Sequence, residues 1–229
     1  MAMITIDIVS DIVCMWCFIG KRRLDKAIQL YKRTYPGGSS DTFVITWRPY
    51  YLQHNRSLPS VDKRVPAEQK LAHMTPEQRT GLMNRMERIA RAVGIRLNHD
   101  GKIGRTRYAH RLILLSQIED QKKSQVGELQ YAMAEKLFQA YHELAKDISD
   151  REVLREIGQN VLGLQAAEID AWLDDEENEK RVNDEAQRNL ELVSAGVPVF
   201  LIQGEEYRVD GAQDIEDFMD IFVRIRGSI

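Results

Sequence analysis

The chain has 229 residues and a formal net charge of −3, with 29% charged and 43% apolar residues. This composition is typical of a globular protein that buries a core without disulfide crosslinks. The charge gives no positive field that would favour nucleic acid, and no run of about 18 apolar residues predicts a membrane span. The N-terminal segment is typical of a strand rather than a signal peptide, so we expect a cytoplasmic protein with neither nucleic-acid nor membrane partners.

The first elements predicted along the chain are a strand, a helix and a strand. Residues 3–9 alternate and are rich in β-branched side chains, which favours a strand. Residues 18–35 place their apolar side chains on one stripe, which favours a helix. A loop over 36–41 leads to a second predicted strand, 43–52. This order is typical of a parallel βαβ unit.

The long middle of the chain, residues 66–195, is predicted to be wholly helical. Thr75 and Gln78 fit the capping box that opens a helix, and Ser149 and Glu152 fit a second one. No strand pattern interrupts this block, so it is predicted to be an all-helical insertion.

Strand patterns return near the C-terminus, at 197–204 and 207–211, and a helix is predicted to follow from 212. One sheet is therefore predicted to form from both ends of the chain. The predicted class is α/β, in the order βαβ…ββα, with the helical insertion between the two halves.

The only two cysteines, Cys14 and Cys17, stand three positions apart at the predicted junction of strand and helix. A helix start presents unpaired N–H groups and the positive end of the helix dipole, which lower a thiol pKa. Cys14 is predicted to be the nucleophile, and the more buried Cys17 to resolve the mixed disulfide. Met15 and Trp16, between them, are expected to cap the site and to lie near the substrate.

Two other interpretations of the cysteines stay open. They could form half of a zinc site, although zinc prefers four ligands and the chain has no second cysteine pair. They could also be two buried core residues, since free cysteine is often buried. We expect no metal.

A second signal is the proline in "GVPVFLI", which opens a predicted strand. Proline cannot donate a hydrogen bond to the sheet, so Pro198 fits a strand start or an edge. A cis bond before it would expose the backbone of Val197 to an extended substrate. Alone this motif indicates a turn, but together with the cysteine pair it favours redox chemistry.

Five segments in order, "SDIVCMWCFIGKRRL", "TRYAHRL", "DISDREVL", "GVPVFLI" and "VDGAQ", span nearly the whole chain. They resemble the DsbA-like thioredoxin-fold superfamily, and within it the cytosolic FrnE-like branch. That branch is related to 2-hydroxychromene-2-carboxylate isomerases and kappa-class glutathione transferases. The resemblance implies a thioredoxin fold interrupted by a large helical insertion domain. The expected parts are the N-terminal half of the thioredoxin fold in 1–60, the insertion in 61–180 and the C-terminal half in 181–229.

The resemblance also implies a thiol–disulfide oxidoreductase or isomerase, with Cys14 as nucleophile, Cys17 as resolving thiol and Pro198 as the facing cis-proline. The expected substrates are disulfides of proteins or small molecules. No tightly bound cofactor is expected, although glutathione is a candidate co-substrate, and a homodimer is among the oligomeric states left open.

The chain departs from the family at two positions. Met15 replaces the proline that usually follows the first cysteine, and Arg105 replaces an asparagine before Thr106. His110 and Arg107 are candidates for the border of the active cleft, against the alternative that both are ordinary helix residues.

Two other functions fit the same fold. One is a glutathione-dependent isomerase or transferase, although such relatives carry serine where Cys14 stands. The other is a binding module without enzymatic activity, with an apolar patch around Trp16 and Phe18.

Overall fold

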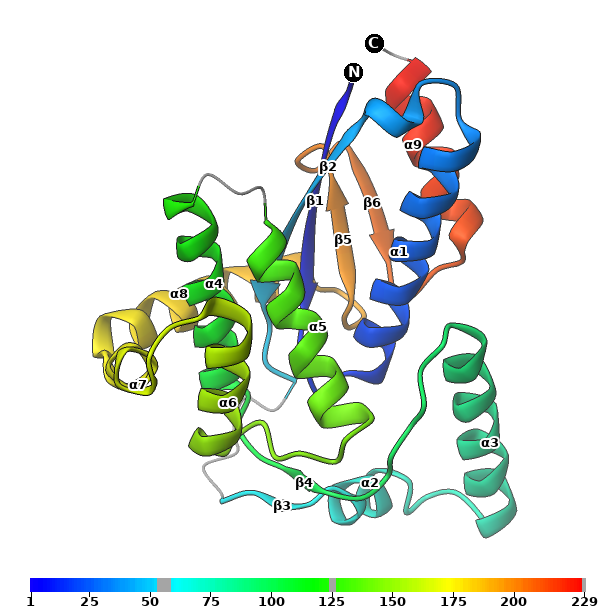
Figure 1. Ribbon diagram of the computed structural model, residues 1–229. Helices are drawn as coiled ribbons and strands as arrows, with labels where there is room; N and C mark the ends of the chain where they lie inside the picture. Colours follow the sequence, from blue (N-terminus) through cyan, green and yellow to red (C-terminus); the bar gives the residue numbers. More distant parts are fainter. Residues whose placement is uncertain (53–58, 124–126, 228–229) are drawn as a thin grey trace.

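The computed structural model describes residues 1–52, 59–123 and 127–227, and its centre is a four-stranded sheet (Figure 1). The strand order is β2-β1-β5-β6. β1 and β2 are parallel, as the βαβ pattern predicts, whereas β5 is antiparallel to both β1 and β6. Both chain ends therefore contribute to one sheet. The strand bounds are β1 Met3–Ser10, β2 Thr42–Pro49, β5 Val199–Ile202 and β6 Tyr207–Asp210.

Helices α1 (Met15–Thr34) and α9 (Ile215–Gly227) pack together beside the sheet (Figure 1). Aromatic side chains join them: the ring centroid of Phe222 lies 5.7 Å from that of Tyr31 and 5.0 Å from that of Phe43 on β2. Between α1 and β2 the loop contains a short 3₁₀ turn, Gly38–Ser40. These contacts fix the direction of α1, whose first turn carries both cysteines.

The insertion is helical, as predicted, but it also contains a short antiparallel ladder of β3 (Val61–Asp62) and β4 (Lys102–Ile103). Strands of two residues are too short for a periodic pattern, and their partners lie far apart in sequence, so no local signal indicates them. The helices are α2 Arg64–Lys70, α3 Pro76–Ala92, α4 Arg107–Lys122, α5 Glu128–His142, α6 Arg151–Leu162, α7 Ala166–Asp174 and α8 Glu176–Leu192.

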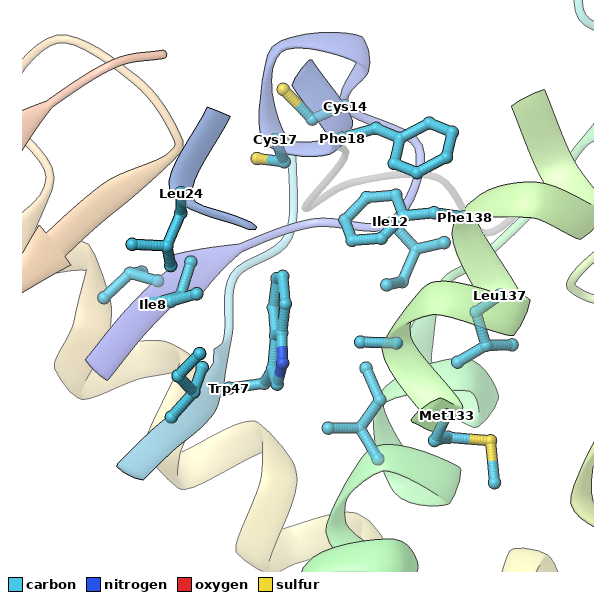
Figure 2. Packing of buried hydrophobic residues seen from close by; sticks show 14 of the residues in the cluster. Ile8, Ile12, Cys14, Cys17, Phe18, Leu24, Trp47, Met133, Leu137 and Phe138 are labelled. Atoms are coloured by element: carbon cyan, nitrogen blue, oxygen red, sulfur yellow. The ribbon is translucent and has the colours of Figure 1, made fainter. Parts of the chain in front are cut away.

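The insertion covers the edge strand β2 and shares the core of the sheet. The Gln130 side chain on α5 accepts a hydrogen bond from the Trp47 N–H (3.1 Å) and donates one to its carbonyl oxygen (3.4 Å). Phe18 on α1 and Phe138 on α5 stack with centroids 5.1 Å apart (Figure 2). Buried residues of both parts belong to one contiguous apolar cluster, so the insertion and the sheet stabilise each other.

Helix α8 runs without a break through residue 180, where the sequence places the end of the insertion. Asn189, near its end, donates a hydrogen bond to the carbonyl oxygen of Pro49 on β2 (2.8 Å). None of the helices in the described parts of the chain is long and apolar enough to cross a membrane.

The two predicted capping boxes have different outcomes. Thr75 and Gln78 form the predicted reciprocal cap at the start of α3. At α6 the N-cap is Asp150, whose carboxylate accepts from the N–H groups of Glu152 and Val153. The Ser149 prediction is wrong because the Ser149 hydroxyl donates instead to the carboxylate of Asp147 (2.6 Å).

We predict that Asp150→Ala lowers the free energy of unfolding by about 1 kcal/mol, because two N–H groups of α6 lose their partner. Asp150→Asn is the matched control, since asparagine caps a helix about as well as aspartate. Denaturant unfolding of both variants tests this, and equal losses in the two would contradict the assigned cap.

Candidate active site around the two cysteines

Both cysteines lie where the turn after β1 enters α1. Cys14 is the N-cap residue of the helix, and its N–H donates to the carbonyl oxygen of Asp11 (3.0 Å). Cys17 lies in the first turn, and both side chains project to the same side of the chain (Figure 2). The thiols are not joined in a disulfide. Cys14 is 8% exposed and Cys17 is fully buried, so Cys14 is the sulfur that a substrate can reach.

The pKa values of the two thiols shift in opposite directions. A hydrogen bond from the Cys17 thiol is the largest influence that lowers the pKa of Cys14, and the N–H groups of Cys17 and Trp16 add to it. Burial and the charge of Asp11 oppose this lowering without reversing it. Burial raises the pKa of Cys17 well above its ordinary value, and the bond and charge of Cys14 raise it further. The predicted effect of the helix amides is present, but the neighbouring thiol contributes more.

The proline loop lies directly against this turn. The Val197–Pro198 peptide bond is cis, and the Cys14 thiol donates to the carbonyl oxygen of Val197 (Sγ to O, 3.4 Å). On α1, a Cβ atom added to Gly20 would lie 3.1 Å from Cγ of Pro198 and 3.0 Å from the Phe200 ring. Because such contacts are tighter than usual, a glycine at position 20 lets the proline loop approach the helix.

The two residues between the cysteines face different surroundings. Trp16 is 41% exposed, which places an aromatic surface beside the more accessible thiol. Met15 is half-buried and lines a cavity next to the turn. Both positions agree with contact to a bound substrate, and their roles stay predictions.

Of the two candidates on α4, only His110 reaches the cysteine turn. His110 is buried, and its Nε2 lies 3.4 Å from Oδ1 of Asp11. Arg107 instead pairs with Glu179 on α8, with Nη1 3.6 Å from Oε1, and its guanidinium lies over the Tyr51 ring. Arg107 is therefore engaged between α4 and α8 in this structure, whereas His110 acts on the turn through Asp11.

Asp11 is a site residue to which the sequence analysis gave no role. Its side chain is 1% exposed, and Oδ2 accepts a hydrogen bond from the N–H of Leu52 (2.9 Å) while Oδ1 faces His110. Its charge also acts on both thiols. The one available signal was its place three residues before Cys14 in "SDIVC".

His142 on α5 is a second residue without a sequence signal. Its Nε2–H donates to the carbonyl oxygen of Ile12 (2.9 Å), and its ring stacks near Phe18 and Phe138. Burial lowers its pKa to about 3, so the imidazole is neutral at ordinary pH. Two helices of the insertion thus bind consecutive residues of the turn, α4 at Asp11 and α5 at Ile12.

A cavity of about 450 Å³ opens beside the turn. Val13 and Met15, the neighbours of Cys14 in the chain, line it together with side chains from α2, α3 and the end of α5. Figure 1 shows α2 and α3 standing across from the start of α1. Within the three described ranges, no group of three or more histidine, cysteine, aspartate or glutamate side chains is arranged to hold a metal ion.

A family model described as DSBA-like thioredoxin domain matches residues 5–223. No curated protein matches the sequence. Solved structures do match in fold. A probable DsbA oxidoreductase from Streptomyces coelicolor has a TM-score of 0.78 at 24% identity, covering 99% of this chain and 91% of that one. The cytosolic disulfide reductase DsbM from Pseudomonas aeruginosa, solved with GSH, has a TM-score of 0.60 at 19% identity, covering 98% and 100%.

A 2-hydroxychromene-2-carboxylate isomerase has a TM-score of 0.61 at 16% identity, covering 98% of this chain and 95% of that one. Identities this low carry the likeness of fold alone. Together with the family match, they confirm the predicted thioredoxin fold with its helical insertion.

We predict that His142 makes the protein less stable in acid. Its pKa is about 3 when folded and about 6.5 when unfolded, so between these values only the unfolded chain binds the proton. The free energy of unfolding should therefore fall by about 1.4 kcal/mol per pH unit as the pH drops below about 6.5.

Denaturant unfolding at several pH values tests this in wild type and His142→Gln, which cannot titrate. The variant should show the shallower slope below pH 6.5, and His73→Gln, at an exposed histidine, should keep the wild-type slope. Parallel curves for wild type and His142→Gln would contradict the burial of a neutral imidazole.

Proposed function

This chain belongs to the DSBA-like thioredoxin domain family, and from that premise we propose that it is a thiol–disulfide oxidoreductase or isomerase. Cys14 is the nucleophile and Cys17 the resolving thiol. The opposite pKa shifts of the two thiols support this assignment most strongly, because only a thiolate attacks a disulfide. The lower pKa belongs to the more exposed sulfur, which a substrate meets first.

The proposed exchange has two steps. The Cys14 thiolate attacks one sulfur of a substrate disulfide, forms a mixed disulfide with it and releases the other sulfur as a thiolate. Cys17 then loses its proton and attacks Cys14, which forms the Cys14–Cys17 disulfide and releases the second substrate thiolate. The substrate disulfide gains two electrons and the cysteine pair gives up two. The reverse steps oxidise a dithiol, and relative reduction potentials decide the direction.

The raised pKa of Cys17 has a function in this sequence of steps. A protonated resolving thiol donates its hydrogen bond to the Cys14 thiolate and thereby stabilises the attacking form. It attacks only after its proton leaves, so deprotonation of Cys17 precedes formation of the Cys14–Cys17 disulfide.

The backbone next to Pro198 supports a binding mode for the substrate. The carbonyl oxygen of Val197 is within hydrogen-bond distance of the sulfur of Cys14, so a chain bonded to that sulfur lies beside the loop. An extended substrate can then pair with the backbone of Val197, as a strand pairs with a sheet edge. Trp16 offers an exposed aromatic face on the same turn.

Glutathione is proposed as a co-substrate that reduces the cysteine pair, in line with the DsbM structure solved with GSH. The start of α9 offers few hydrogen-bond donors to a carboxylate of glutathione, because its N–H groups already have acceptors in the chain. The N–H of Gln213 donates to the carbonyl oxygen of Gly211 (3.0 Å), and the N–H of Asp214 donates to the carboxylate of Asp217 (2.9 Å). Its binding is therefore expected at Cys14 and the Val197 backbone rather than at this helix start.

A glutathione-dependent isomerase is the second candidate, because the fold is shared with a 2-hydroxychromene-2-carboxylate isomerase. That chemistry needs no resolving thiol, whereas this chain places Cys17 within hydrogen-bond reach of Cys14. The effect of removing Cys17 separates the two candidates.

We predict that Cys14→Ser reduces disulfide exchange with a model disulfide to the uncatalysed rate, because the nucleophile is lost. Cys17→Ser should instead accumulate a stable protein–substrate mixed disulfide, since no thiol remains to displace the substrate. Intact-protein mass spectrometry detects that adduct, and absorbance of the released thiol gives the rates.

Thermal unfolding of both variants serves as the folding control. Exchange that continues undiminished in Cys14→Ser would exclude the proposed nucleophile. Turnover of an isomerase substrate that survives in Cys17→Ser, with no trapped adduct, would favour the second candidate.

A further inference from the structure

The cavity beside the cysteine turn has an apolar lining that the exchange reaction itself does not need. From it we infer the class of substrate: a polypeptide that carries a large apolar side chain next to its reacting cysteine. The inference rests on the proposed function and specifies which disulfides the site selects.

The cavity borders the turn that carries the nucleophile, although Cys14 itself does not line it. Val13 and Met15 flank Cys14 in the chain, and both line it. The facing wall comes from the α2–α3 segment, where Met83 and Met86 project from consecutive turns of α3. A volume of about 450 Å³ is within the range of ligand-binding pockets. A substrate bonded to Cys14 therefore has an apolar cavity beside the residue next to its own cysteine.

The basic side chains that line the cavity do not favour an anionic ligand, because each already has an acceptor within the chain. Lys63, Arg64 and Arg79 are each bound to acceptors of the chain itself, and Glu68 adds a negative charge to the same lining. An anionic group would have to compete with these contacts, whereas a neutral side chain leaves them intact. The acceptors are the carbonyl oxygen of Asn98 for Lys63 (2.5 Å), the carboxylate of Asp62 for Arg64 (2.9 Å) and the carbonyl oxygen of Met74 for Arg79 (3.1 Å).

The methionines indicate a range of apolar side chains rather than one. Methionine is unbranched and polarisable, so a surface built from it adapts to differently shaped partners. The cavity contains Met15, Met83 and Met86, with Leu71 and Leu97 beside them. Leucine, methionine and phenylalanine side chains are all apolar and can all pack against such an adaptable surface.

The same lining separates peptides from glutathione. The cysteine of glutathione is flanked by γ-glutamate and glycine, and neither offers an apolar side chain for the cavity. A peptide with phenylalanine or leucine beside its cysteine places an apolar side chain in the cavity and keeps the same backbone contact at Val197. Full burial of such a side chain corresponds to about a ten- to hundredfold preference.

The test uses short peptides whose cysteine forms a mixed disulfide with an aromatic thiol. Attack of Cys14 on the peptide sulfur forms a protein–peptide disulfide and releases the coloured thiolate, which gives the rate. Peptides with phenylalanine before or after the cysteine are compared with a glycine peptide and with glutathione in the same linkage. The second-order rate constant of this single exchange should be about tenfold or more higher for at least one phenylalanine peptide than for the glycine peptide.

Variants locate the preference in the cavity. Met83→Gln combined with Met86→Gln keeps side-chain length and helix propensity, and it should bring the phenylalanine-to-glycine ratio close to one. Met86→Gln alone, with one polar group, should lower the ratio part of the way. Met3→Gln, at a methionine that is 62% exposed on β1, is the matched control and should leave the ratio unchanged.

Equal second-order rate constants for the phenylalanine and glycine peptides would overturn the inference, as would an unchanged ratio in folded cavity variants. The proposed function would stand in either case if Cys14→Ser still abolished exchange. If wild type exchanged with no peptide, the proposed function would fail, and calorimetry with serine in place of the peptide cysteine would decide the inference. Equal affinities for the phenylalanine and glycine forms would then overturn it.

Discussion

The geometry of the active site depends on how the turn from Asp11 to Cys14 is held. The turn leaves the sheet at the end of β1 and enters α1 at Cys14. Two histidine side chains of the insertion hold it in place. His110 binds the side chain of Asp11, and His142 binds the carbonyl oxygen of Ile12. Buried hydrogen bonds of this kind are costly to break. The insertion therefore fixes the place where the thiols are presented.

An ion cluster around the buried Lys21 side chain forms a second connection between α1 and the insertion. The Lys21 side chain is 1% exposed, and its Nζ lies 3.1 Å from the carboxylate of Asp25 and 2.8 Å from that of Glu135 on α5. It also lies 3.8 Å from the centroid of the Tyr131 ring. Loss of both carboxylates would leave the buried Lys21 charge uncompensated. Helix α1 is therefore bound, one turn after Cys17, to α5, which is also the helix whose His142 binds Ile12.

Local patterns were enough to predict the order of strands and helices and the two thiols, whereas the thioredoxin fold was implied by the family resemblance. The alternation of 3–9, the capping box at Thr75 and the spacing of the cysteines are all encoded within a few residues. The contacts that complete the site join residues far apart in sequence: Asp11 with His110 and Ile12 with His142. Neither pair leaves a periodic signal, because a single buried contact constrains only two positions. The ladder of β3 and β4 was missed for the same reason.

The central claim is that the Cys17 thiol and the helix amides stabilise the Cys14 thiolate and so lower the pKa of Cys14. The measurement that tests it most directly is the ultraviolet absorbance of the thiolate as a function of pH, in wild type and in Cys17→Ala. The account predicts that Cys14 titrates below the ordinary value of about 8.5 in wild type and at higher pH in Cys17→Ala, because the largest stabilising bond is gone. Titration of Cys14 at or above the ordinary value in wild type would contradict it.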